Sequence, residues 1–152
     1  MCQHRFMRNI FLIFLVMTPL VYAGEYVLMP QSAVQAMLSQ CSRSAPKIEG
    51  SWDPTDEDIA GLEANLLKLK DVEATECCGR GKLESNPEDC FRQYVGVVIE
   101  GTRFIYINSV SDNWFGSKHV PQIVCDGGKS FWGALYNPVS QEFSHLNFNG
   151  GA

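Results

Sequence analysis

The sequence predicts an α+β fold in which two N-terminal helices pack on a four- to five-stranded antiparallel meander sheet. The 152 residues are 45% hydrophobic and 19% charged, which is typical of one globular domain. Helical periodicity is confined to the first half of the chain, whereas the second half has β-branched and aromatic runs separated by turn sequences. Because no helical segment separates those runs, the strands should pair antiparallel.

Residues 1–23 form three zones typical of a secretory signal peptide. His4, Arg5 and Arg8 give a positive start, Ile10–Val16 is apolar, and Val21-Tyr22-Ala23 is a small-x-small cleavage sequence. The apolar stretch is about 12 residues long, and a membrane-spanning helix needs about 20. We therefore predict cleavage after this sequence, export to the periplasm or the extracellular space, and no membrane association of the mature chain.

The remaining chain, residues 24–152, is predicted to be a single acidic domain. Without the leader it has 10 basic and 17 acidic residues, a net charge of −7. Residues 24–89 hold 13 acids and six bases, whereas residues 90–152 hold four of each. This balance excludes binding of nucleic acid through its phosphates, because that affinity comes from clustered Lys and Arg. The acidic half forms either a solvated helix face or a surface complementary to a basic partner protein.

The first helix is predicted over Gln31–Ser42, after an extended stretch at Glu25–Met29. Val34, Met37, Leu38 and Cys41 recur at helical spacing, so the predicted core face includes the cysteine.

The start of the second helix is predicted from its capping residues. Thr55 can cap with Asp58, or Asp53 can cap with Pro54 at the first helical position. Trp52 is the expected staple residue ahead of this helix. The buried stripe of the helix is Ile59, Leu62, Leu66 and Leu69.

From Cys90 onward the pattern predicts strands that form one sheet, with both helical stripes covering one of its faces. Gly96 and Gly133 lie inside apolar strands and indicate a bulge or a close helix approach. The expected segments are a hairpin of Tyr94–Ile99 and Arg103–Asn108 around Glu100-Gly101, a second of Gln122–Cys125 and Ser130–Tyr136 around Asp126-Gly127-Gly128, and a last strand at Glu142–Phe148.

Five cysteines follow the predicted leader, and an oxidising compartment favours disulfides among them. We predict a local bridge from Cys77 or Cys78 to Cys90 and a second bridge from Cys41 to Cys125, which leaves one cysteine over. The alternative is a metal site built from Cys77, Cys78 and Cys90 with a histidine. Adjacent cysteines lack the spacing of two to four residues usual in structural zinc sites, so we predict no metal and no other cofactor.

Two groups of residues resemble small exported bacterial proteins of unassigned function. They are Val124-Cys125-Asp126-Gly127-Gly128 with Phe131-Trp132-Gly133, and Arg92-Gln93-Tyr94-Val95-Gly96 with Ile105-Tyr106-Ile107-Asn108. The resemblance implies export but no activity. The predicted architecture resembles the cystatin-like and NTF2-like folds, which include both binding proteins and enzymes.

The sequence contains no recognised catalytic motif. Only His119 and His145 follow the leader as histidines, and neither a Gly-x-Ser-x-Gly elbow nor a phosphate-binding glycine loop is present. The best candidate surface is the connection Ser109–Val120, which carries Trp114, Phe115 and His119. These aromatic residues either close the open end of the sheet or contact a partner.

We predict a non-enzymatic exported binding protein, such as an inhibitor or immunity-type partner of another protein. The alternative is a small-ligand or enzymatic pocket of NTF2-like type, with Trp114, Phe115, His119, Asp126 and Trp132 around it. A structural component of the cell envelope or a secreted effector is a third hypothesis.

Overall fold

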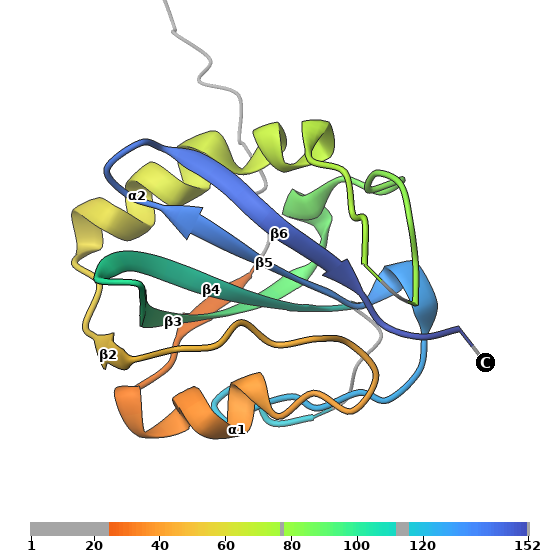
Figure 1. The fold of residues 1–152 in the computed structure, drawn as a ribbon, viewed down its shortest axis with the longest axis horizontal. Helices are drawn as coiled ribbons and strands as arrows, with labels where there is room; N and C mark the ends of the chain where they lie inside the picture. Colours follow the sequence, from red (N-terminus) through yellow and green to blue (C-terminus); the bar gives the residue numbers. More distant parts are fainter. Residues whose placement is uncertain (1–24, 77, 112–115, 152) are drawn as a thin grey trace, which may run out of the picture.

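The computed structural model describes residues 25–76, 78–111 and 116–151 and has a six-stranded sheet between two helical layers (Figure 1). The predicted leader, Cys77, Trp114 and Phe115 lie outside the described residues. In chain order the elements are β1 (Tyr26–Leu28), α1 (Val34–Leu38), β2 (Gly50–Trp52), α2 (Asp56–Asn65), β3 (Phe91–Ile99), β4 (Thr102–Val110), β5 (Trp132–Asn137) and β6 (Glu142–Phe148). Single-turn or short 3-10 helices span Gln31–Ala33, Leu66–Asp71, Pro87–Asp89 and Gly128–Ser130.

The antiparallel meander of β3, β4, β5 and β6 is confirmed. These strands follow one another in space in chain order, and each pair is antiparallel. The predicted hairpin turn at Glu100-Gly101 is also present, with both residues in the left-handed region. Four of the five predicted strands are therefore confirmed.

The sheet is mixed rather than purely antiparallel, because β1 runs parallel to β3. β1 and β2 share the outer edge of β3. β1 lies beside Arg92–Tyr94, and β2 lies antiparallel beside Gly96–Val98. Strands of three residues are too short to give an alternating pattern, which is why the sequence showed only an extended stretch before the first helix and nothing at Gly50–Trp52.

Gly96 provides the space that β2 needs. A Cβ atom at this position would lie 2.2 Å from the backbone oxygen of Trp52 and 2.9 Å from its indole ring. The close approach predicted here is therefore made by a strand and not by a helix. Trp52 itself is part of β2, and its indole Nε1 donates to the Phe104 carbonyl at 3.0 Å. Its side chain also packs against the core cluster that contains Ile59 of α2, so its place in β2 is compatible with the predicted staple role.

The two helices cover opposite faces of the sheet, so the prediction that both cover one face is wrong (Figure 1). Val95 and Val97 belong to the core on the α1 side, whereas Tyr94 belongs to the core on the α2 side. Alternate residues of a strand point to opposite faces, so a strand buried on both sides shows a continuous apolar run. This run is the signal in β3 that distinguishes a three-layer fold from a two-layer one.

α2 begins as the sequence predicts. The Thr55 side chain accepts from the Asp58 amide, and the Asp58 carboxylate accepts from the Thr55 amide at 2.8 Å, which forms a capping box. The whole predicted stripe is buried, although its last two members, Leu66 and Leu69, belong to the 3-10 helix that continues α2. No helix in the described part of the chain is long and apolar enough to cross a membrane.

The first helix is shorter than predicted. α1 ends at Leu38, and the Ser39 amide bonds back to the carbonyls of Gln35 and Ala36. Cys41 therefore lies beyond the helix and is exposed rather than part of the core. Val34, Met37 and Leu38 are buried as expected.

The predicted disulfide between Cys41 and Cys125 is confirmed. It joins the segment after α1 to the segment before β5, rather than a helix to the sheet. The local bridge to Cys90 stays a prediction, because Cys77 lies outside the described residues. Cys78 is exposed and Cys90 is buried.

Candidate functional site

The predicted site residues do not converge on one pocket. His119 and Asp126 are exposed, whereas Trp132 is fully buried in the core under α2. Tyr136, which follows Trp132 on the same face of β5, is also fully buried in that core. Trp132 and Tyr136 are thus packed in the interior, away from the surface that carries His119 and Asp126.

His119 and Asp126 do lie on one continuous segment, Ser117–Asp126, which we call the recognition segment. Gln122–Cys125 was predicted as a strand of a second hairpin, and that prediction is wrong because no strand is present there. The segment packs on the α1 side of the sheet, next to the end of α1 (Figure 1). Its inward carbonyl groups are bonded by side chains instead of by a neighbouring strand.

Three buried amide side chains bond five carbonyls of the recognition segment, and we call them the amide ladder. Gln93 Nε2 donates to the carbonyls of Lys118 and Val120 at 2.9 and 2.8 Å. Asn108 Nδ2 donates to the Gln122 carbonyl at 2.9 Å. Asn149 Nδ2 donates to the carbonyls of Val124 and Asp126 at 2.5 and 3.2 Å. The five carbonyls belong to alternate residues. The backbone turns at Ser117–Val120, where the Val120 amide donates to the Ser117 carbonyl at 3.1 Å, and the alternation indicates an extended backbone from Val120 onward.

The ladder is built on adjacent strands. Gln93 of β3 and Asn108 of β4 are paired in register, are almost completely buried, and bond to each other at 3.2 Å. The Gln122 amide also donates to Gln93 Oε1 at 2.9 Å. Buried amides require partners, and the recognition segment provides them. The sequence signal that could have located this arrangement is the pair of amide residues, Gln93 and Asn108, beside the apolar runs of β3 and β4.

Arg43 bonds to two members of the amide ladder, Asn108 and Asn149. Its side chain is buried and donates to Asn149 Oδ1 at 2.8 Å, to the Tyr106 hydroxyl at 3.1 Å, and to Asn108 Oδ1. All of these partners are neutral, and no acidic residue in the described ranges forms an ion pair with Arg43.

Gly133 and the disulfide complete the arrangement around Arg43. A Cβ atom at Gly133 would lie 3.0 Å from Arg43 Nε, so glycine leaves room for the guanidinium. The bulge predicted at Gly133 is also present, between Gly133 and Leu135 in the β5–β6 pair. Arg43 is two residues from Cys41, so the same stretch of chain is joined to the recognition segment by the disulfide and to the amide ladder by the guanidinium.

The outward side of the recognition segment is partly apolar. Val120 is 55% exposed and Ile123 is 43% exposed, and His119 is exposed beside Val120. Lys118, at the start of the segment, forms an ion pair with Glu25 and lies 5.8 Å from the centre of the Phe91 ring. The segment therefore presents apolar side chains on a backbone whose inner side is bonded to the sheet.

A second buried polar cluster lies on the α2 side of the sheet and joins α2 to β3. Arg92 is fully buried, and its guanidinium contacts Glu63 of α2 at 3.0 Å and the Tyr94 hydroxyl at 2.7 Å. Further bonds run from Arg92 to the carbonyls of Pro87 and Cys90. The Tyr94 hydroxyl donates to Glu63, which completes a closed triad between α2 and β3.

The triad predicts a specific loss of stability at alkaline pH. Burial raises the pKa of the Tyr94 hydroxyl well above its usual value; the charge of Arg92 opposes this shift and that of Glu63 adds to it. The contribution of Tyr94 is fully present below the unfolded pKa near 10, above which the unfolded state loses the proton first. The free energy of unfolding should then fall by about 1.4 kcal/mol per pH unit. Denaturant titrations from about pH 9 to about pH 11 should show this slope in the wild type above about pH 10, and a shallower slope there in Tyr94→Phe. Equal slopes would contradict the assignment.

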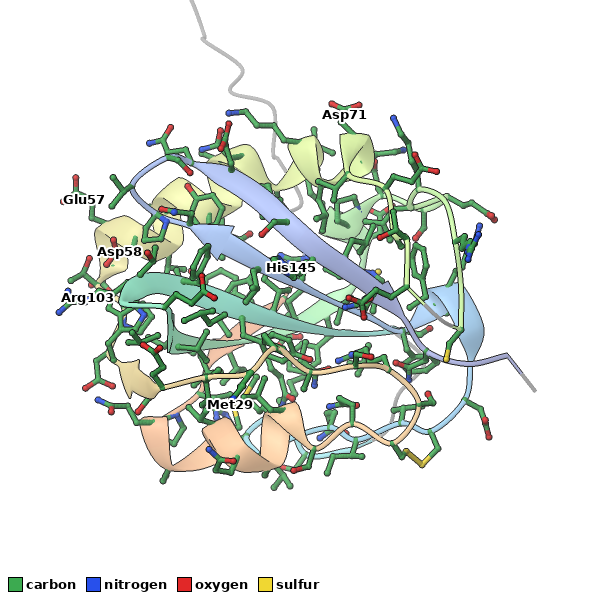
Figure 2. All side chains as sticks on the ribbon, in the orientation of Figure 1. Met29, Glu57, Asp58, Asp71, Arg103 and His145 are labelled. Atoms are coloured by element: carbon green, nitrogen blue, oxygen red, sulfur yellow. A yellow bond between two sulfur atoms is a disulfide. The ribbon has the colours of Figure 1, made fainter. Side chains whose placement is uncertain are left out.

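Three hollows on the surface are lined by none of the predicted site residues. One lies between α1 and β2, and the other two are both lined by His145, which Figure 2 labels near the centre of the view. Within residues 25–76, 78–111 and 116–151, no group of three or more His, Cys, Asp or Glu side chains could hold a metal ion.

The recognition segment thus combines exposed apolar side chains with a backbone that is hydrogen-bonded to the sheet. No family model, curated protein or solved structure matches the chain.

Proposed function

We propose that the protein is an exported, non-enzymatic binding protein that recognises another protein through the recognition segment, as an inhibitor or immunity-type partner would. The observation that carries this proposal is the amide ladder, which fixes the inner side of the segment while Val120 and Ile123 face outward. A surface that is ordered before binding loses less conformational entropy when the complex forms.

Export is supported by two independent features. The first 23 residues have the zones of a signal peptide. The Cys41–Cys125 disulfide joins two exposed cysteines, and such bridges persist in oxidising compartments. Cys125 belongs to the recognition segment, so a bridge that persists in an oxidising compartment also holds the proposed surface in place.

The partner is expected to be basic. After removal of the leader the net charge is −7, and Glu57 and Asp58 lie at the start of α2, where Figure 2 shows them at the edge of the molecule. Such a field accelerates encounter with a positively charged protein. The association rate should fall as salt is added, whereas the dissociation rate should change less.

The proposal is tested by capture from the extracytoplasmic fraction at low salt, with three forms of the immobilised protein. The wild type should retain one stoichiometric basic protein. The double variant Val120→Ser/Ile123→Ser removes both apolar side chains from the proposed surface without changing its charge. It should retain at least tenfold less, because the apolar area that is buried on binding is lost. Val139→Ser is the control, since Val139 is 91% exposed in the turn between β5 and β6.

Two outcomes would contradict the proposal. One is equal retention of the same protein by all three forms, which would place recognition elsewhere. The other is repeated absence of any stoichiometric protein. The NTF2-like pocket is the weaker hypothesis, because Trp132 is fully buried in the core.

A further inference from the structure

A hollow lies beside β6, on the edge of the sheet opposite to β1 and β2. One wall is formed by Ser144–Asn147 of β6, and the other by Glu73, Thr75 and Glu76, which follow the 3-10 continuation of α2. Its volume is about 260 Å³. We call it the acidic slot, because both glutamates are exposed and no Lys or Arg lines it.

Both walls of the acidic slot have polar backbone groups. β6 is the last strand of the sheet and pairs with β5 on one side only. In the other wall, Ala74 exchanges two hydrogen bonds with Gly81, at 2.8 and 3.1 Å, so the adjacent peptide groups of Glu73 and Thr75 point away from Gly81. Among the described residues, no backbone hydrogen bond joins the two walls.

We propose that the acidic slot binds a short, extended, basic segment of a partner protein, which adds to the outer edge of β6 as a further strand. An exposed strand edge provides hydrogen bonds to any peptide backbone, and side-chain contacts select the sequence. Here the selecting groups are Glu73 and Glu76, which lie three residues apart and favour a Lys or Arg near each end of the incoming segment.

The bulge in β6 favours a short peptide over a second copy of this chain. The β5–β6 register shifts between Gly133 and Leu135, and His145 has a φ of 52°. A bulge bends an edge strand and interrupts its regular pairing, so continuous sheet extension between two copies is disfavoured. The same interruption limits an added peptide to pairing with a few residues of β6 on one side of His145. A second copy would also bring two acidic slots together, which like charges oppose.

The test uses the full exported protein and a fluorescent peptide of alternating sequence, Lys-Val-Lys-Val-Lys. A second peptide has the same sequence with methyl groups on alternate backbone nitrogens, so it keeps the charge but loses strand-pairing donors. The protein variants are Glu73→Gln/Glu76→Gln and a matched control, Glu57→Gln/Asp71→Asn, which removes the same charge from exposed positions elsewhere. Affinity is measured by fluorescence anisotropy, and the location by changes in amide chemical shifts.

The wild type should bind the unmethylated peptide, with shift changes at Glu73–Glu76 and Phe143–Asn147. The slot variant should bind about fivefold more weakly, because two exposed ion pairs are lost, and the control should change by less than about twofold. Equal binding of the methylated peptide, equal weakening by the control, or shift changes elsewhere would overturn the proposal. These residues are separate from Val120 and Ile123, so failure here and failure of the recognition segment are distinguishable.

Discussion

Replacement of Glu63 by alanine is expected to lower the free energy of unfolding by about 3 kcal/mol, because it leaves the buried Arg92 without its carboxylate. Arg92 is fully buried and contacts Glu63 Oε2 at 3.0 Å. Its bonds to the carbonyls of Pro87 and Cys90 remain, but they do not neutralise the charge. Urea denaturation of the two proteins measures the difference.

The variant Glu63→Gln separates the charge from the hydrogen bonds. It keeps an acceptor for Arg92 and removes the negative charge, so we expect an intermediate loss of about 1.5 kcal/mol. Glu57→Ala, at an exposed position of the same helix, should cost no more than about 0.5 kcal/mol. A Glu63→Ala protein as stable as Glu57→Ala would show that the triad does not hold α2 on β3.

Replacement of Gly96 by alanine is the second large expected effect, a loss of about 2 kcal/mol. The new Cβ atom would lie 2.2 Å from the Trp52 backbone oxygen, so β2 must move away from β3. That movement also strains the bond from the Trp52 indole to the Phe104 carbonyl. Thermal and urea denaturation measure the loss, and a shift in tryptophan fluorescence reports the movement of Trp52.

Gly50 offers a matched control on the same strand pair. It lies opposite Val98, and a Cβ atom there would meet no heavy atom within 4 Å. Gly50→Ala should therefore change stability by less than about 0.5 kcal/mol. If the two alanine variants were equally stable, the close approach of β2 at Gly96 would be wrong.

Local signals in the sequence predicted the elements that depend on short-range chemistry. The capping box of Thr55 and Asp58 located the start of α2, and Glu100-Gly101 located the hairpin of β3 and β4. The disulfide between Cys41 and Cys125 was also among the predicted pairings. Each of these features is determined by residues a few positions apart or by the chemistry of one residue type.

Apart from this disulfide and the order of the meander, features that depend on contacts between distant segments were not predicted. The layer that each helix covers depends on which face of β3 it meets. The apolar run Val95–Val98 indicates that both faces are buried, but it does not indicate which helix covers which face. β1 and β2 exist because the outer edge of β3 is long enough for both. Neither segment has a pattern of its own that distinguishes it from a loop.

The recognition segment shows the same limit of prediction from sequence. Gln122–Cys125 has the composition of a strand, and the segment is extended, but its carbonyls are bonded by Gln93, Asn108 and Asn149. Composition indicates an extended backbone, but it does not indicate which groups form hydrogen bonds with that backbone. The relevant information was in the amide residues of β3, β4 and the C-terminal stretch.

The proposed function requires that the amide ladder orders the recognition segment before any partner binds. Amide hydrogen exchange of the free protein, resolved by residue, tests it directly. The Gln122 amide, which donates to the buried Gln93, should exchange at least a hundredfold more slowly than that of Ile123, for which no acceptor is found among the described residues. Uniformly fast exchange across Ser117–Asp126 would contradict the claim, because the segment would then be unordered until it met its partner.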